Sequence, residues 1–277
     1  MSEPRRLQFT GGTGEPLAGR LHLPEGQTVG HALIAHCFTC SKDYKSMRRI
    51  SETLAEHGFG ALSFDFTGLG ESRGDFASTT FSSNLEDIEA AAAFLKQEAG
   101  EVSLLVGHSL GGAAVLAAAE RIPSVRAVAT IAAPSDTEQL ARKLDDARGR
   151  TARGAAGPDG NRDDTGDQSA DPPNPTGQDP FEVEIGGRRI RLGSGLLEDL
   201  RKQNLHEKVS SLPAPLMIFH SPSDRVVDIA HARKLFELAP HPKSFVSLGE
   251  ADHLLIDEAE DAIWVGHMLA AWGRRYV

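Results

Sequence analysis

Short apolar segments alternate along this chain with segments whose apolar residues recur every three or four positions. Apolar runs bounded by turn residues predict buried strands, whereas spacings of three and four predict the buried face of a helix. The alternation predicts an α/β fold, in which a mostly parallel central sheet of about eight strands has helices on both faces. We expect residues 1–277 to form one such domain.

The pattern locates the individual elements. Strands are expected at residues 7–10, 17–23, 32–35, 60–64, 102–106, 125–131, 216–219 and 244–248. Gly-Gly-Thr-Gly separates the first two, which predicts an antiparallel hairpin. Helices are expected around Met47, Ile50 and Leu54, after a cap at Ser83 or Asn84, after residue 109, over 228–238 and over 258–272.

A segment without large apolar residues interrupts this pattern. Residues 145–180 contain no Val, Ile, Leu, Met, Phe, Trp, Tyr or Cys. Such a segment buries too little apolar surface to offset an ordering entropy of about 1–2 kcal/mol per residue. We expect a polar, disordered insertion in the cap position, and the alternative is a lid that folds over a bound substrate.

Charge and composition narrow the classes of partner. The chain carries a net charge of −10, with 40% hydrophobic and 25% charged residues, which argues against nucleic acid and anionic membrane as partners. Residues 1–6 lack the apolar core of a signal peptide, and no apolar run is long enough to span a bilayer. We therefore expect a cytoplasmic protein, and the sequence indicates no protein partner.

The strongest chemical motif is Gly-His-Ser-Leu-Gly at residues 107–111. It follows the strand predicted at 102–106 and opens an alanine-rich helix. A strand, then G-x-S-x-G, then a helix is the context of a nucleophile elbow, where a sharp turn projects a serine hydroxyl from the top of a sheet. Ser109 is therefore the candidate nucleophile.

A serine needs a base to remove its proton and an acid to orient that base. In this architecture the chain order is serine, acid, histidine, with the last two on loops after later strands. Asp224 follows the strand at 216–219, and His253 follows the strand at 244–248. They are the candidate acid and base. Asp136 is the competing acid, and we expect His108 to face away from the reaction.

Two backbone N–H groups are expected to hold the oxyanion that forms during acyl transfer. The first is that of Leu110, which follows the candidate nucleophile. The second lies in the loop after the strand at 32–35, where Phe38 is the expected donor and Thr39 is next.

Two other motifs carry less weight. Cys37 and Cys40 suggest a redox pair or half a zinc site, but there is no second C-x-x-C and no convincing histidine partner. We expect two free thiols that pack a turn, with redox modulation as the alternative. The glycine-rich loop at 65–72 lacks the third glycine of a dinucleotide fingerprint, and we expect it on the rim of the site. We expect no cofactor and no metal.

Taken together, these motifs resemble the α/β-hydrolase superfamily over nearly the whole chain. The segments D-x-x-G-x-G-x-S at 65–72 and G-x-S-x-G-G at 107–112 are similar to those of serine aminopeptidase (S33)-like hydrolases. The segments at 36–43, 64–72, 81–84 and 133–136 resemble the hydrolase half of bacterial proteins fused to an OsmC-like peroxidase domain. His-Cys-Phe at 36–38 departs from the commoner His-Gly-x of the family's oxyanion loop.

The residues and the resemblance together predict a serine hydrolase that cleaves a carboxylic ester or related acyl bond of a small molecule. An aminopeptidase-type amide hydrolase is the alternative enzyme. The other alternative is a non-catalytic interaction module that partners a peroxidase-type protein.

Overall fold

The computed structural model describes residues 3–38, 40–155, 180–185 and 188–277. Its central sheet has eight strands in the order β1-β2-β4-β3-β5-β6-β9-β10. The strands are β1 (Arg5–Thr10), β2 (Pro16–His22), β3 (Gly30–Ala35), β4 (Phe59–Phe64), β5 (Val102–His108), β6 (Ala127–Ile131), β9 (Leu216–His220) and β10 (Lys243–Ser247). β2 pairs antiparallel with β1 and β4, and the remaining pairs are parallel. The predicted α/β fold is confirmed.

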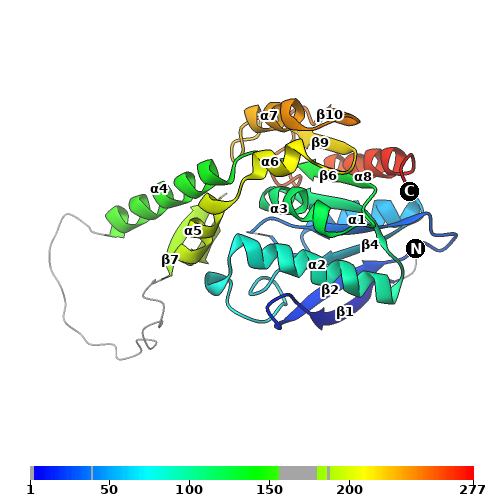
Figure 1. The fold of residues 1–277 in the computed structure, drawn as a ribbon, viewed down its shortest axis with the longest axis horizontal. Helices are drawn as coiled ribbons and strands as arrows, with labels where there is room; N and C mark the ends of the chain where they lie inside the picture. The colour runs from blue at the N-terminus through cyan, green and yellow to red at the C-terminus, as the bar shows by residue number, and fades with distance from the viewer. Residues whose placement is uncertain (1–2, 39, 156–179, 186–187) are drawn as a thin grey trace.

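Helices cover both faces of this sheet (Figure 1). The helices are α1 (Lys45–Glu56) and α8 (Ala259–Gly273) on one face, and α2 (Phe81–Glu98), α3 (Leu110–Ala118), α6 (Leu205–Ser210) and α7 (Ala230–Leu238) on the other. Alternate residues of each strand face the two layers: Leu33 of β3 lies in one core and Ile34 in the other. Because the parallel strands are buried on both faces, they are the continuous apolar runs that the sequence shows.

The eight predicted strands are all present, with ends that differ by at most two residues. One helix start is wrong, because α2 begins at Phe81 rather than after Ser83 or Asn84. Thr80 Oγ1 accepts a hydrogen bond from the Ser83 amide at 3.0 Å, and Ser83 Oγ accepts one from the Thr80 amide at 2.9 Å. This reciprocal capping box selects Thr80 among several neighbouring hydroxyl residues.

A polar insertion in the cap position fits the prediction, but its expected start at residue 145 is wrong. Helix α4 (Thr137–Ala155) continues into it, and residues 156–179 lie outside the described residues. Ala141 and Leu144 are buried before the insertion begins, so the packed face of the helix starts upstream of residue 145. Asp145 then pairs with Arg201 at 2.7 Å, and the Arg148 guanidinium lies 4.7 Å from the ring centre of Phe181.

Further elements complete the region after β6. The strands β7 (Phe181–Ile185) and β8 (Arg188–Leu192) form an antiparallel pair, and α5 (Ser194–Lys202) follows. In Figure 1, α4 and β7 extend beyond the end of the central sheet. The cap position therefore holds folded elements, α4, β7, β8 and α5, that were not predicted from the sequence. Short 3₁₀ turns occur at η1 (Phe76–Ser78) and η2 (Ala119–Arg121).

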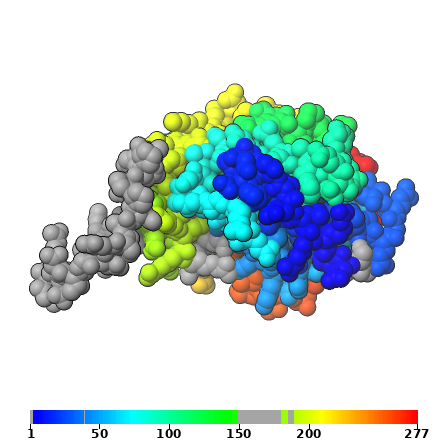
Figure 2. Space-filling model, turned by 90° about the horizontal axis from the view of Figure 1, so that it is seen from below, coloured from blue at the N-terminus to red at the C-terminus, as the bar shows by residue number. Residues whose placement is uncertain are grey.

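The N-terminal hairpin of β1 and β2 lies on the surface beside α2 (Figure 2). The ring of Phe9 stacks on that of Phe94, with centres 4.6 Å apart, and the Gly12 amide donates to Asp87 at 3.1 Å. These contacts attach the antiparallel edge of the sheet to the helix layer. In the described part of the chain, no helix is long and apolar enough to cross a membrane.

Candidate active site

Ser109 occupies the sharp turn between β5 and α3. Its φ of 54° and ψ of −122° lie in a backbone region that residues other than glycine rarely adopt. The turn is tight because the chain passes close to itself: a Cβ on Gly107 would lie 2.3 Å from Gly111 O, and one on Gly111 would lie 2.5 Å from Ala35 O. Both flanking glycines of the motif are thus required by backbone contacts, as the nucleophile elbow predicts.

The structure brings Ser109, His253 and Asp224 together. His253 Nε2 lies 3.1 Å from Ser109 Oγ, and His253 Nδ1 lies 2.7 Å from Asp224 Oδ2. The three side chains come from the loops after β5, β10 and β9, whose carboxyl ends share one edge of the sheet. This is the edge where open α/β sheets bind their ligands.

Asp224 is buried and fully engaged. Its Oδ1 accepts hydrogen bonds from the amides of Val226 at 2.8 Å and Val227 at 3.0 Å. Burial by itself raises the pKa of this carboxyl group, but the hydrogen bond and charge interaction with His253, with help from the two amides, lower the pKa below its ordinary value. The group is therefore an anion at neutral pH, aimed at His253 Nδ1.

The two expected oxyanion donors border the same space. Phe38 and Leu110 line a cavity together with Ser109 and His253. Leu110 is the first residue of α3, and the first amides of a helix have no acceptor within it. Phe38 follows β3, and its ring packs edge-on against Phe76, with centres 5.0 Å apart. Thr39, the second choice, lies outside the described residues.

The loop that carries Phe38 is anchored by a buried ion pair. Asp65 accepts a hydrogen bond from the Lys42 amide at 2.6 Å, and Lys42 Nζ lies 3.2 Å from the same carboxylate. Burial raises the pKa of Asp65, but His36, the Glu71 amide and the Lys42 amide outweigh it and lower the pKa to about 2. The loop at 65–72 thus braces His36 and Lys42, which lie on either side of Phe38 in the sequence. It does not line the cavity, so its predicted place on the rim is wrong.

The competing acid, Asp136, is not the partner of His253. Asp136 lines the cavity, but its Oδ1 accepts from the Gln139 amide at 2.9 Å, at the start of α4. Asp252 accepts hydrogen bonds from the amides of Leu254, Ile256 and Asp257 and is therefore a turn-forming residue. His108 lies behind the site: its Nε2 is 2.8 Å from the backbone oxygen of His253. Burial is the main cause that lowers the pKa of His108 to about 3, so its ring is neutral.

The cavity measures about 750 Å³, and α4 forms one of its walls. The wall residues are Gln139, Leu140, Lys143, Leu144 and Ala147, and Glu184 of β7 adds to them. The sequence-based predictions did not include this wall. The spacing of Leu140, Leu144 and Ala147 after Asp136 is a helix signal that would have found it.

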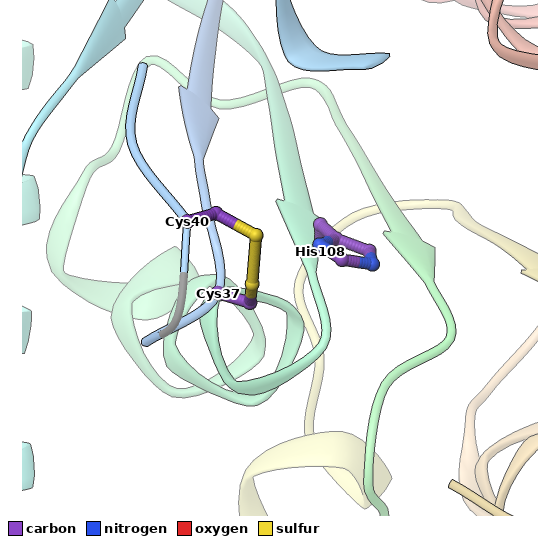
Figure 3. Close-up of side chains that lie close together, drawn as sticks. All are labelled: Cys37, Cys40 and His108. Carbon is purple, nitrogen blue, oxygen red and sulfur yellow. A yellow bond between two sulfur atoms is a disulfide. The ribbon is translucent and has the colours of Figure 1, made fainter. Parts of the chain in front are cut away.

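The prediction of two free thiols is wrong. Cys37 and Cys40 form a disulfide, with their Cα atoms 5.3 Å apart (Figure 3). The bond closes the turn whose second residue is Phe38. A separation of three residues places two Cys side chains within bonding distance when the chain turns back on itself, as it does where the Cys40 amide donates to Cys37 O at 3.2 Å.

The fold and the serine–histidine contact define an α/β serine hydrolase. Residues 31–260 match the family of serine aminopeptidase, S33, and the chain belongs to this family. An esterase domain from Rhodothermus marinus is 42% identical over 99% of both chains, with a TM-score of 0.75.

Two more distant structures share the fold alone. Est1E from Butyrivibrio proteoclasticus, solved with ferulic acid, is 19% identical, with 98% of this chain and 99% of that chain covered and a TM-score of 0.74. XC6422 from Xanthomonas campestris, described as an a/b serine hydrolase without lid, is 17% identical, with 98% and 96% covered and a TM-score of 0.63. A comparison with curated proteins finds no match.

Proposed function

We propose that this protein is a carboxylesterase-type serine hydrolase. The observation that carries the proposal is the unbroken chain of contacts from Ser109 Oγ through His253 to the buried Asp224 carboxylate, at the wall of a cavity of about 750 Å³. A cavity of this size suits a small-molecule acyl substrate.

In the proposed first step, Ser109 Oγ attacks the carbonyl carbon of the ester while its proton passes to His253 Nε2. The carbonyl π electrons move to the oxygen, and the N–H groups of Phe38 and Leu110 stabilise the resulting anion. Asp224 keeps the proton of His253 on Nδ1, so that Nε2 is the free base, and stabilises the imidazolium. The tetrahedral intermediate then expels the alcohol, which takes the proton from Nε2.

The second half repeats these steps with water. His253 Nε2 removes a proton from a water molecule that attacks the acyl-Ser109 carbonyl carbon. Collapse of the second intermediate breaks the bond to Ser109 Oγ, which recovers its proton from His253, and the carboxylic acid leaves. No cofactor takes part in this sequence.

The esterase domain from Rhodothermus marinus supports an ester rather than an amide substrate. The lining also favours an uncharged acyl group, since Phe38, Leu110, Leu140 and Leu254 are among the residues that line the cavity. Aminopeptidase action is the second candidate. Asp136, Asp252 and Glu184 are among the residues that line the same cavity, and acidic residues suit the α-ammonium of a peptide.

A panel of p-nitrophenyl esters of increasing chain length and aminoacyl p-nitroanilides separates the candidates. We expect ester turnover that Ser109→Ala abolishes and that Ser210→Ala, an exposed serine on α6, leaves unchanged. Turnover of the anilides alone would favour the aminopeptidase. No turnover of either class, with stable co-purification of another protein, would favour a non-catalytic interaction module and contradict the proposal.

A further inference from the structure

The disulfide between Cys37 and Cys40 lies against a buried histidine from the neighbouring strand. A ring nitrogen of His108 and the two sulfur atoms lie within 4.8 Å of one another, and all three residues are buried. Figure 3 shows the imidazole ring alongside the S–S bond. The pairing of β3 with β5 explains this contact: Ala35 lies opposite Gly107, so the residues that follow on each strand meet at the same edge of the sheet.

The hydrogen bonds of His108 leave one ring nitrogen bare. Nε2 lies 2.8 Å from the backbone oxygen of His253. Because a carbonyl oxygen only accepts, Nε2 carries the ring proton and Nδ1 carries a lone pair. Nδ1 is buried, and within the described residues it has no hydrogen-bond partner. A buried nitrogen without a partner loses its hydration without compensation, which costs free energy. Such groups are uncommon in native proteins and often mark a functional site or an ion that is not bound.

This arrangement is that of a metal-binding imidazole. Histidines that ligate a metal through one nitrogen usually donate the other N–H to a carbonyl or carboxylate, which fixes the ring. His36, although adjacent to Cys37, is arranged differently, because its Nδ1 contacts the backbone oxygen of Cys37 at 2.6 Å and its Nε2 faces Asp65 at 3.4 Å. The cluster therefore has one suitable histidine, which the sequence alone does not connect to the two cysteines.

We infer that the reduced form of this cluster is a Zn²⁺ site, with Cys37 Sγ, Cys40 Sγ and His108 Nδ1 as its three protein ligands. In a tetrahedral zinc site the bond lengths place ligand atoms about 3.6–3.8 Å apart. A cluster that spans 4.8 Å reaches this geometry by small side-chain shifts once the S–S bond is cleaved. Cys37 lines the cavity, from which a water molecule fills the fourth position.

The site forms in two balanced steps. A dithiol reductant transfers two electrons and two protons to the disulfide, which gives two cysteine thiols and the oxidised cyclic form of the reductant. Zn²⁺ then displaces one proton from each thiol, and two protons are released for each ion bound. The oxidised protein has no thiolate to offer and binds no zinc here.

The test uses the full chain, reduced with dithiothreitol, desalted under anaerobic conditions and titrated with Zn²⁺ against a chromophoric chelator. We expect one equivalent of zinc per reduced chain and none per oxidised chain. His108→Asn removes a ligand, and its affinity should fall at least about 100-fold, since loss of outer-shell partners alone costs 10–100-fold. His22→Asn is the matched control, because His22 is a buried histidine on β2, and it should bind zinc like the wild type.

Co²⁺ provides a readout that does not depend on affinity. The reduced wild type should show thiolate-to-cobalt charge transfer, and Cys40→Ser should show a weakened band. Circular dichroism and a thiol count under denaturing conditions accompany each sample. Zinc uptake by the oxidised protein, or equal uptake by folded His108→Asn, would overturn the inference. It would also be overturned if protein with two counted thiols binds no zinc, or if the reductant fails to generate the two thiols.

Discussion

His108 and His253 are joined by a hydrogen bond: His108 Nε2 donates to the backbone oxygen of His253 at 2.8 Å. The residue beside the candidate nucleophile thus holds the loop that carries the candidate base. Ser109 Oγ is hydrogen-bonded to His253 Nε2, and we infer that His108 acts through His253 as a positioning residue.

Replacing His108 with Leu should lower kcat about tenfold with little change in KM, because a lost hydrogen bond of about 1–1.5 kcal/mol corresponds to that factor in rate. His108→Gln, whose amide N–H reaches toward the same oxygen, should recover most of the rate. Ester kinetics on oxidised protein, with melting temperatures as a control, check this. Equal losses in the Leu and Gln variants would contradict a positioning role.

Asp224→Asn should reduce kcat about 10⁴-fold, the loss typical of a wrong histidine tautomer. The amide oxygen can keep the hydrogen bonds from Val226 and Val227. Its NH₂ group then faces His253 Nδ1, which must become the acceptor, so that Nε2 carries the proton and no longer acts as a base. Single-turnover kinetics on a folded variant check this, and a loss under tenfold would contradict the assigned role of Asp224.

Gly107→Ala should destabilise the protein by at least about 2 kcal/mol, in the range of strained backbone substitutions. Its Cβ would meet backbone atoms of Gly111 and Gly112, which cannot move without displacing the elbow. Gly26→Ala is the control, since a Cβ there meets nothing within 4 Å. Urea unfolding measures both variants. Similar unfolding free energies for the two would show that the turn is not sterically constrained.

The buried Asp65 should make stability depend on acid pH. Its pKa is lowered from the ordinary 3.8 to about 2. The contribution of this carboxylate to the free energy of unfolding is therefore fully present above the pKa of the unfolded state, and it is lost as the pH falls through the pKa of the folded state. That contribution is about 2 kcal/mol.

Urea unfolding of wild type and Asp65→Asn across this pH window checks the assignment. The variant should be less stable at neutral pH, where Lys42 Nζ loses a carboxylate partner, and its stability should fall less steeply in acid. Parallel pH profiles for the two proteins would contradict a lowered pKa at Asp65.

The parts of the fold and site that follow from local pattern could be predicted from the sequence. Strand and helix periodicity predicted the elements of the sheet and its helix layers, because the apolar pattern of each element shows which of its residues are buried. Ser109, Asp224 and His253 could be found because each follows a strand, and parallel strands place their following loops at one edge.

The parts that depend on long-range contacts could not. Residues 137–155 are rich in charge and alanine, and α4 is held by contacts with residues far along the chain, such as Arg201. The contact of His108 with the two cysteines depends on the pairing of β3 with β5. The 65–72 loop resembles a rim element in sequence, but the Asp65–Lys42 ion pair directs it to the back of the oxyanion loop.

Intact mass spectrometry after treatment with an alkyl fluorophosphonate tests whether Ser109 is an activated nucleophile. The wild type should gain the mass of one phosphonyl group, and peptide mapping should place it on Ser109. Folded Ser109→Ala should gain none, while Ser210→Ala should be labelled like the wild type. Labelling that persists in Ser109→Ala, or a folded wild type that is never labelled, would show that Ser109 is not the nucleophile.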